Sequence, residues 1–256
     1  MRFTERLDQS SQSLLCIGLD IDLNKVPAEH KRAPDPIFSF NKHIIDATAD
    51  FVCAYKPNIA FYEMYGTKGL DALTKTIDYI HAKNILVILD AKRGDIGNSS
   101  AAYARAAFEV FKADAVTVNP YMGEDSIEPF ANYVDKGIFI LCLTSNPGAK
   151  DFQTRENLYK QVAKKAVKWD HNQNIGLVVG ATKPGQLKEI RKIVGRMPIL
   201  IPGVGTQGGD LIQSVKAGID KSGGRAIINV SRAVIYSNNP RKMAQDLRDK
   251  INFIRK

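Results

Sequence analysis

The amino-acid sequence predicts an α/β protein, a single (β/α)8 (TIM) barrel that spans residues 1–256. Three observations support this prediction. Eight short apolar runs recur along the chain at fairly regular spacing, segments with helical periodicity separate them, and eight βα units in about 250 residues match the usual size of this fold. Apolar residues make up 44% of the chain and charged residues 25%, as in ordinary globular proteins.

The expected strands are mostly continuous apolar runs, as is typical of strands that are buried on both faces. They cover residues 14–19, 51–56, 85–90, 115–119, 138–143, 175–180, 199–202 and 226–230. If these strands close into a barrel, the active site lies at their carboxyl ends, where the βα loops begin. An open doubly wound sheet is the alternative architecture.

Apolar residues three or four positions apart predict helices that pack one face on the strands. The sets are Leu70, Leu73, Ile77 and Ile80; Leu158, Val162, Ala166 and Trp169; and Met243, Leu247, Ile251 and Ile254. The stretch 26–36, which contains prolines, is expected to be a loop after the first strand. Since no internal repeat or long linker is found, no second domain is expected.

Lysine and arginine exceed aspartate and glutamate by 36 − 27 = 9 charges. These charges are spread over several expected helix faces, which is typical of a solvated surface, so no nucleic-acid partner is expected. A mild positive field would still attract an anionic small molecule.

The location of the protein is expected to be cytoplasmic, with no membrane contact. The longest apolar run, 138–143, is far shorter than a membrane-spanning helix, and the polar start of the chain is not typical of a secretory signal. Three cysteines lie far apart in apolar runs: Cys16, Cys53 and Cys142. They are expected to be buried free thiols.

The third expected strand ends in a carboxylate–lysine array. Asp90 and Lys92 are two residues apart, so on a regular strand they point to the same side, and Asp95 follows after Gly94. Burying such charges is unfavourable, which favours a functional role over a purely stabilising ion-pair network. The lysine should stay protonated beside carboxylates, so a proton donor is favoured over a Schiff-base nucleophile.

Two further strand ends carry charged residues, Asp20 after the first strand and Lys56 at the end of the second. Together with the array they predict alternating charges around one pocket. The four histidines are scattered without the spacing of metal ligands, so no metal site is expected.

A glycine-rich loop follows the seventh strand, and Gly203, Gly205 and Gly208 match the G-x-G-x-x-G pattern. A dinucleotide site is one interpretation, but the motif follows the seventh strand and lacks an acidic residue at the expected offset. In a barrel, the loops after strands 7 and 8 commonly bind phosphate. Arg232, after the eighth strand, would supply a forked cation, so a phosphate monoester is predicted.

The polar segment 143–148 after the fifth strand either orients a polar ring or is a plain turn.

The motifs at the strand ends together resemble the orotidine 5′-phosphate decarboxylase family, in its longer bacterial branch, over nearly the whole chain. The resemblance rests on GLDID at 18–22, YKPN at 55–58, LDAKRGDI at 89–96, LTSNPG at 143–148, PGVGTQGG at 202–209 and NVSRA at 229–233.

The resemblance implies a homodimer that needs no cofactor and converts orotidine 5′-monophosphate to UMP and CO2 in pyrimidine synthesis. Lys92 would donate a proton to C6, with Asp90 beside the leaving carboxylate and Lys56 and Asp95 completing the charged network. Asp95 and Ile96 would enter the pocket from a second subunit. Ser99 stands where the family usually has threonine at the same interface.

The resemblance also implies the remaining substrate contacts. Asp20 and Lys56 would hold the ribose, Thr144 and Ser145 the pyrimidine, and Gln207 and Arg232 the phosphate. The other substrate-binding candidates are Pro202, Gly203, Gly208 and Ser231.

Three alternatives remain. A sister activity, Mg²⁺-dependent decarboxylation of a sugar phosphate or aldol chemistry, would share D-x-K-x-x-D and depend on the metal. A nucleic-acid binder would need a continuous basic stripe with aromatic residues. An NAD enzyme would bind a nicotinamide nucleotide.

Overall fold

A computed structural model describes residues 1–10, 12–205 and 209–256. Its strands form a closed barrel in chain order, in which every neighbouring pair is parallel and β8 returns to β1. The strands are β1 (Leu15–Gly18), β2 (Ala54–Lys56), β3 (Leu86–Arg93), β4 (Ala115–Val118), β5 (Gly137–Leu143), β6 (Ile175–Val179), β7 (Ile199–Pro202) and β8 (Ala226–Val230). The predicted (β/α)8 barrel is therefore confirmed, and the open sheet is excluded.

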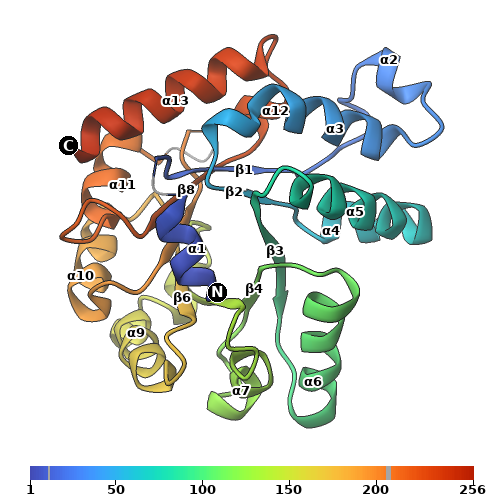
Figure 1. The fold of residues 1–256 in the computed structure, drawn as a ribbon. Coiled ribbons are helices and arrows are strands. Elements are labelled where there is room, and N and C mark those ends of the chain that lie inside the picture. The colour runs from blue at the N-terminus through green and yellow to red at the C-terminus, as the bar shows by residue number, and fades with distance from the viewer. Residues whose placement is uncertain (11, 206–208) are drawn as a thin grey trace.

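The helices mostly surround the strands as a ring, and one of them lies across an end of the barrel (Figure 1). They are α1 (Phe3–Gln9), α2 (Ala28–Lys31), α3 (Pro36–Thr48), α4 (Ala60–Glu63), α5 (Gly66–His81), α6 (Gly97–Arg105), α7 (Glu124–Ala131), α8 (Ala149–Phe152), α9 (Leu158–Trp169), α10 (Pro184–Val194), α11 (Leu211–Gly218), α12 (Arg232–Ile235) and α13 (Pro240–Arg255). Two 3₁₀ turns, Ala49–Phe51 and Arg155–Asn157, and a π-helical turn, Ala106–Val110, complete the set. Among the described residues, no helix is long and apolar enough to cross a bilayer.

Three predicted segments differ from the structure by more than one residue. The second strand begins at Ala54, because Ala49–Phe51 extends the preceding helix as a 3₁₀ turn. The third strand continues past Asp90 to Arg93. The expected loop 26–36 contains the short helix Ala28–Lys31, none of whose residues is buried, so no apolar periodicity marks it.

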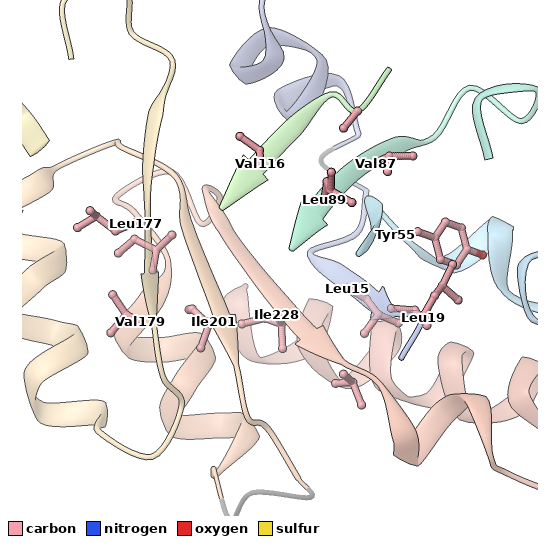
Figure 2. Packing of buried hydrophobic residues seen from close by; sticks show 14 of the residues in the cluster. Leu15, Leu19, Tyr55, Val87, Leu89, Val116, Leu177, Val179, Ile201 and Ile228 are labelled. Carbon is pink, nitrogen blue, oxygen red and sulfur yellow. The ribbon is translucent and has the colours of Figure 1, made fainter. Parts of the chain in front are cut away.

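The larger part of the core lies between the outer face of the barrel and the helices (Figure 2). Leu15, Val87, Val116 and Ile228 are fully buried there. Because their strands are covered on both faces, the runs are apolar throughout, which is why the strands could be found from the sequence.

Two predicted helix stripes pack against the core except at their first residue. In α9 the buried residues are Tyr159, Ala163 and Ala166, whereas Leu158 is 36% exposed at the start of the helix. In α13 Met243 is likewise 36% exposed, and Ala244 takes the buried place. The apolar spacing identified both helices, but small alanines carry much of the contact, and a large side chain at a helix end need not face the core.

A second, smaller core fills the inside of the barrel, and α1 covers the amino-terminal end of the strands (Figure 1). Phe3 is 1% exposed and packs edge-to-face on Phe139 of β5, with ring centroids 5.7 Å apart. Leu7 of the same helix joins this cluster. The barrel is therefore closed at this end and accessible at the other.

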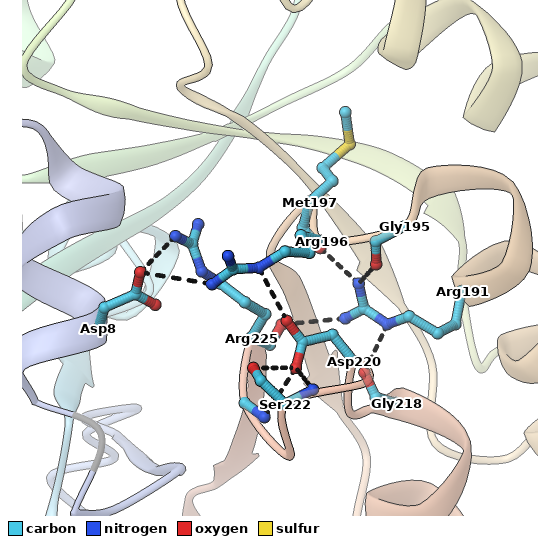
Figure 3. A network of polar contacts seen from close by, with 10 residues as sticks. Asp8, Arg191, Gly195, Arg196, Met197, Gly218, Asp220, Ser222 and Arg225 are labelled. Atoms are coloured by element: carbon cyan, nitrogen blue, oxygen red, sulfur yellow. Dashed lines mark hydrogen bonds and ion pairs between the residues drawn. The ribbon is translucent and has the colours of Figure 1, made fainter.

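Polar contacts around Arg191 hold the loops before β7 and β8 together at the amino-terminal end (Figure 3). Its guanidinium donates to the carbonyls of Gly195, Met197, Gly218 and Arg225 at 2.7–3.0 Å. Burial lowers the pKa of Arg191 to about 10. All four acceptors are backbone carbonyls, so Arg191 supplies donors to carbonyl groups that have no partner within a strand or helix.

The three cysteines are buried and free, as predicted. Burial raises the pKa of each thiol, so these groups behave as small apolar side chains at neutral pH.

Candidate active site

A cavity of about 220 Å³ opens at the carboxyl ends of the strands. Most of the residues singled out in the sequence line it: Asp20, Lys56, Asp90, Lys92, Thr144, Ser145, Pro202, Gly203, Ser231 and Arg232. They come from six different strands or the loops that follow them, and only barrel closure brings them together.

Asp90 is the centre of the charged array. Its Oδ2 accepts a hydrogen bond from Lys56 Nζ at 2.8 Å, and its Oδ1 accepts one from Lys92 Nζ at 2.7 Å. The side chains of Lys56 and Asp90 are only 4% and 11% exposed, whereas that of Lys92 is 46% exposed toward the cavity. Lys56 is thus a buried part of the cavity wall, whereas the side-chain nitrogen of Lys92 is accessible to a molecule bound in the cavity.

Lys56 and Asp90 are both stabilised in their charged forms, although they are buried. Burial works to lower the pKa of Lys56, but attraction by Asp90 and Asp20 outweighs burial and leaves the pKa above its usual value. Burial works to raise the pKa of Asp90, yet Lys56 and Lys92 hold it well below the usual range. At neutral pH the buried pair therefore consists of an ionised carboxylate and an ammonium group.

Asp90 and Lys92 meet through an irregular strand. The register between β3 and β4 shifts between Leu89 and Arg93, and Lys92 has a left-handed backbone with a φ of 47°. The alternation of side chains along a regular strand predicts that Asp90 and Lys92 face one cavity, as they do. It does not predict the register shift or the left-handed residue through which the backbone brings them there.

Asp95, Ile96 and Ser99 are absent from the lining of the cavity in the described part of the chain. The carboxylate of Asp95 accepts a hydrogen bond from the backbone N–H of Ile96 at 2.8 Å, and Ile96 is 55% exposed. Among the described residues Asp95 makes no ion pair with Lys92, so a single chain flanks that ammonium group with one carboxylate and not two.

Two buried oxygen atoms at the cavity have no hydrogen-bond partner in the described part of the chain, Asp20 Oδ1 and Asn229 Oδ1. Buried polar atoms are rarely left unpaired, so these two are acceptors available to donors of a bound molecule. The loop that carries Asp20 is held by Tyr236, whose hydroxyl accepts from Asp22 N at 2.8 Å and lies 3.4 Å from the carbonyl of Asp20.

The loop after β7 has a backbone that only glycine adopts easily. Gly203 and Gly205 have φ angles of 93° and 79°, in the region that disfavours side chains. Arg232, the first residue of α12, lines the cavity next to this loop together with Ser231. Gln207 and Gly208 lie outside the described residues.

The segment after β5 is held in place by Gln153. Gln153 Oε1 accepts a hydrogen bond from the backbone N–H of Thr144 at 2.7 Å, and its Nε2 donates to Thr144 Oγ1 at 2.9 Å. Thr144 and Ser145 both line the cavity. The segment therefore presents fixed polar groups to the cavity.

Several lining residues were missed in the sequence. Asn58 and Asn229 are polar residues at strand ends, and this position was the signal that could have identified them. The lining residues Leu141, Val178 and Leu200 are apolar, so their sequence cannot be told apart from that of core residues. Thr117 was also missed: it touches both Asp90 and Lys92, and its only signal is a polar residue inside an apolar strand. In the described ranges no group of three or more His, Cys, Asp or Glu could hold a metal ion.

Residues 13–247 match the model of a family described as the orotidine 5′-phosphate decarboxylase / HUMPS family. A protein named orotidine 5′-phosphate decarboxylase from Dehalococcoides mccartyi (strain BAV1) is 47% identical, over 100% of this chain and 99% of its own. One of the same name from Azoarcus sp. (strain BH72) is 48% identical, over 96% of each chain. The solved structure of Leishmania donovani OMP decarboxylase superposes with a TM-score of 0.90 at 40% identity, covering 100% of this chain and 99% of that one.

Proposed function

The chain belongs to the orotidine 5′-phosphate decarboxylase / HUMPS family, and on this premise we propose that it is a carboxy-lyase that converts orotidine 5′-monophosphate to UMP and CO2. The observation that carries the proposal is the Lys56–Asp90–Lys92 array at a cavity whose other side carries a glycine-rich loop and Arg232. Such a cavity offers charges for the reacting carbon and donors for a phosphate.

Loss of CO2 from C6 leaves an electron pair on a carbon without an attached electron sink. We propose that the ammonium group of Lys92 stabilises this charge and then transfers its proton to C6, while Asp90 lies beside the leaving carboxylate. A fixed positive charge is most effective in a site where it needs no reorganisation during the reaction. Lys56, which is 2.8 Å from Asp90, supports that arrangement from the wall.

The other contacts are assigned by position in the cavity. We propose that Asp20 and Lys56 bind the ribose, with Asp20 Oδ1 accepting from a hydroxyl, and that Thr144 and Ser145 bind the pyrimidine. The phosphate would lie against Pro202, Gly203, Ser231 and Arg232, with Gln207 and Gly208 as further candidates. Binding energy from the phosphate can hold the reacting ring in place.

We also propose that the active form is a homodimer, in which Asp95, Ile96 and Ser99 reach the cavity of the partner. This is supported by their position outside the cavity of their own chain and by the exposure of Ile96, an apolar residue.

We propose a reducing, cytoplasmic location, which the unpaired state of the three cysteines supports.

The first test is to add the purified protein to orotidine 5′-monophosphate in the presence of EDTA and to follow loss of the orotate absorbance. Rapid loss with UMP as product supports a decarboxylase that is independent of divalent metal. Absence of turnover with EDTA, combined with Mg²⁺-dependent turnover of a sugar phosphate, would contradict it and favour the sister activity.

The proton donor is tested with Lys92→Ala. We expect turnover to be abolished while UMP binding, measured by calorimetry, stays detectable, because Lys92 is the exposed end of the array and not its buried support. Near-normal turnover in this variant would remove Lys92 from the proposed mechanism.

A further inference from the structure

Thr117 lies under the charged array, on the third residue of β4, and is 1% exposed. Its hydroxyl oxygen is 2.9 Å from Asp90 Oδ1 and 2.9 Å from the backbone nitrogen of Lys92. It is absent from the described lining of the cavity. Thr117 therefore contacts the array from behind and does not contact a molecule bound in front of it.

The direction of both hydrogen bonds follows from the groups themselves. The backbone N–H of Lys92 can only donate, so the hydroxyl accepts from it. Asp90 is ionised and can only accept, so the hydroxyl proton must point to Oδ1. One hydroxyl thus binds the carboxylate and the backbone of the neighbouring lysine at the same time, with no freedom to rotate.

This contact coincides with the irregularity in β3. Leu89 pairs with Val116 and Arg93 with Val118, so the three residues 90–92 face the single residue Thr117. Such a bulge leaves backbone groups without ladder partners, and it re-aims a side chain. The Thr117 hydroxyl takes the place of the missing acceptor for Lys92 N–H, at a residue held in the unfavourable left-handed region.

We propose that Thr117 is a positioning residue for the decarboxylation, which holds the Asp90 carboxylate and the left-handed backbone of Lys92 so that the ammonium group of Lys92 faces the reacting carbon. The inference rests on the proposed function, in which Lys92 acts on the substrate. It concerns geometry alone, because Thr117 reaches the substrate only through these two residues.

The test compares Thr117→Val, which keeps the shape and removes the hydroxyl, with Thr117→Ser, which keeps the hydroxyl. The matched control is Thr48→Val, because Thr48 is fully buried and its hydroxyl also makes two hydrogen bonds, to Ile44 O and to the Tyr55 hydroxyl, both at 2.7 Å. For each protein kcat and KM for orotidine 5′-monophosphate are measured, together with exchange of the Lys92 amide proton by NMR.

We expect Thr117→Val to lower kcat by about 10- to 100-fold, as loss of a hydrogen bond to a charged group predicts, and to change KM by less than about threefold. Exchange of the Lys92 amide should become at least about tenfold faster. Thr117→Ser should recover most of kcat, and Thr48→Val should keep both kcat and the Lys92 exchange rate.

The proposal is overturned if Thr117→Val keeps kcat within twofold, if Thr117→Ser fails to recover it, or if Thr48→Val loses as much. A wild-type protein that does not turn over orotidine 5′-monophosphate contradicts the proposed function instead. In that case the Lys92 amide exchange alone decides whether Thr117 holds this backbone, and an unchanged rate in Thr117→Val overturns the positioning role.

Discussion

Replacing Asp90 by Asn should strongly destabilise the fold, because Asp90 is the anion that allows Lys56 to be buried with its charge. The side chain of Lys56 is 4% exposed and that of Asp90 is 11% exposed, and their ion pair is 2.8 Å long. Breaking a buried pair from one side costs about 3–5 kcal/mol, since the remaining charge stays buried without its partner. Lys92 adds little to this figure, because its side chain is 46% exposed.

The assay is urea unfolding at pH 7, followed by the fluorescence of the single tryptophan, Trp169, and by circular dichroism. The matched control is Asp246→Asn, which removes an anion from an ion pair with Lys242 whose side chains are 59% and 72% exposed. That change should alter the free energy of unfolding by about 0.5 kcal/mol or less. The difference between the two variants measures what burial adds to an ion pair.

The effect of Asp90→Asn should also depend on pH, with a defined sign. The pKa of Asp90 is lowered in the folded state, so its stabilisation is complete above the unfolded value of about 3.9 and declines as the pH falls below it. The gap in unfolding free energy between wild type and variant should therefore be constant from about pH 6 to 8 and shrink below about pH 4.

The reasoning is refuted if Asp90→Asn loses no more stability than Asp246→Asn at pH 7. It is also refuted if the gap between wild type and Asp90→Asn widens as the pH falls. Either result would mean that Lys56 is not stabilised by an ionised Asp90.

Two further substitutions, one at each end of the barrel, should affect activity and stability separately. Arg232→Ala should lower kcat/KM for orotidine 5′-monophosphate by about 10- to 100-fold and leave kcat/KM for orotidine, which lacks the phosphate, unchanged; an unaltered value for the nucleotide removes Arg232 from the site. Phe3→Ala, at the closed end, should lower the free energy of unfolding by about 3–5 kcal/mol in a denaturation experiment without changing KM, because it removes a buried ring packed on Phe139. A changed KM would show that the two ends are coupled.

Much of the fold could be predicted from local sequence, because a barrel strand is buried on both faces and reads as a continuous apolar run. The residues 199–202 and 226–230 were located without error for this reason. The start of β2 was not, because Phe51 opens an apolar run in the sequence but belongs to the 3₁₀ turn Ala49–Phe51 that follows a helix. The first residue of two helix stripes, Leu158 in α9 and Met243 in α13, was assigned wrongly, because a large side chain at a helix end need not face the core.

The candidate site was predicted where charge interrupts an apolar run. Asp20, Lys56 and Asp90 each follow or end such a run, and the structure brings all three to one cavity. Apolar residues such as Leu141 and Val178 carry no such signal, since the lining of a cavity and the core of a barrel have the same composition.

The eight βα units, the charged strand ends and the glycine-rich loop can all be read from local sequence, because burial and backbone conformation restrict residue types locally. Closure of the barrel, in contrast, decided that Lys56 and Lys92 bind opposite oxygens of Asp90, and that Asp95 does not pair with them in its own chain. It also decided that Thr117 lies opposite the bulge in β3. These are relations between residues distant in the chain or set by an irregular backbone, and they exist only once the barrel closes.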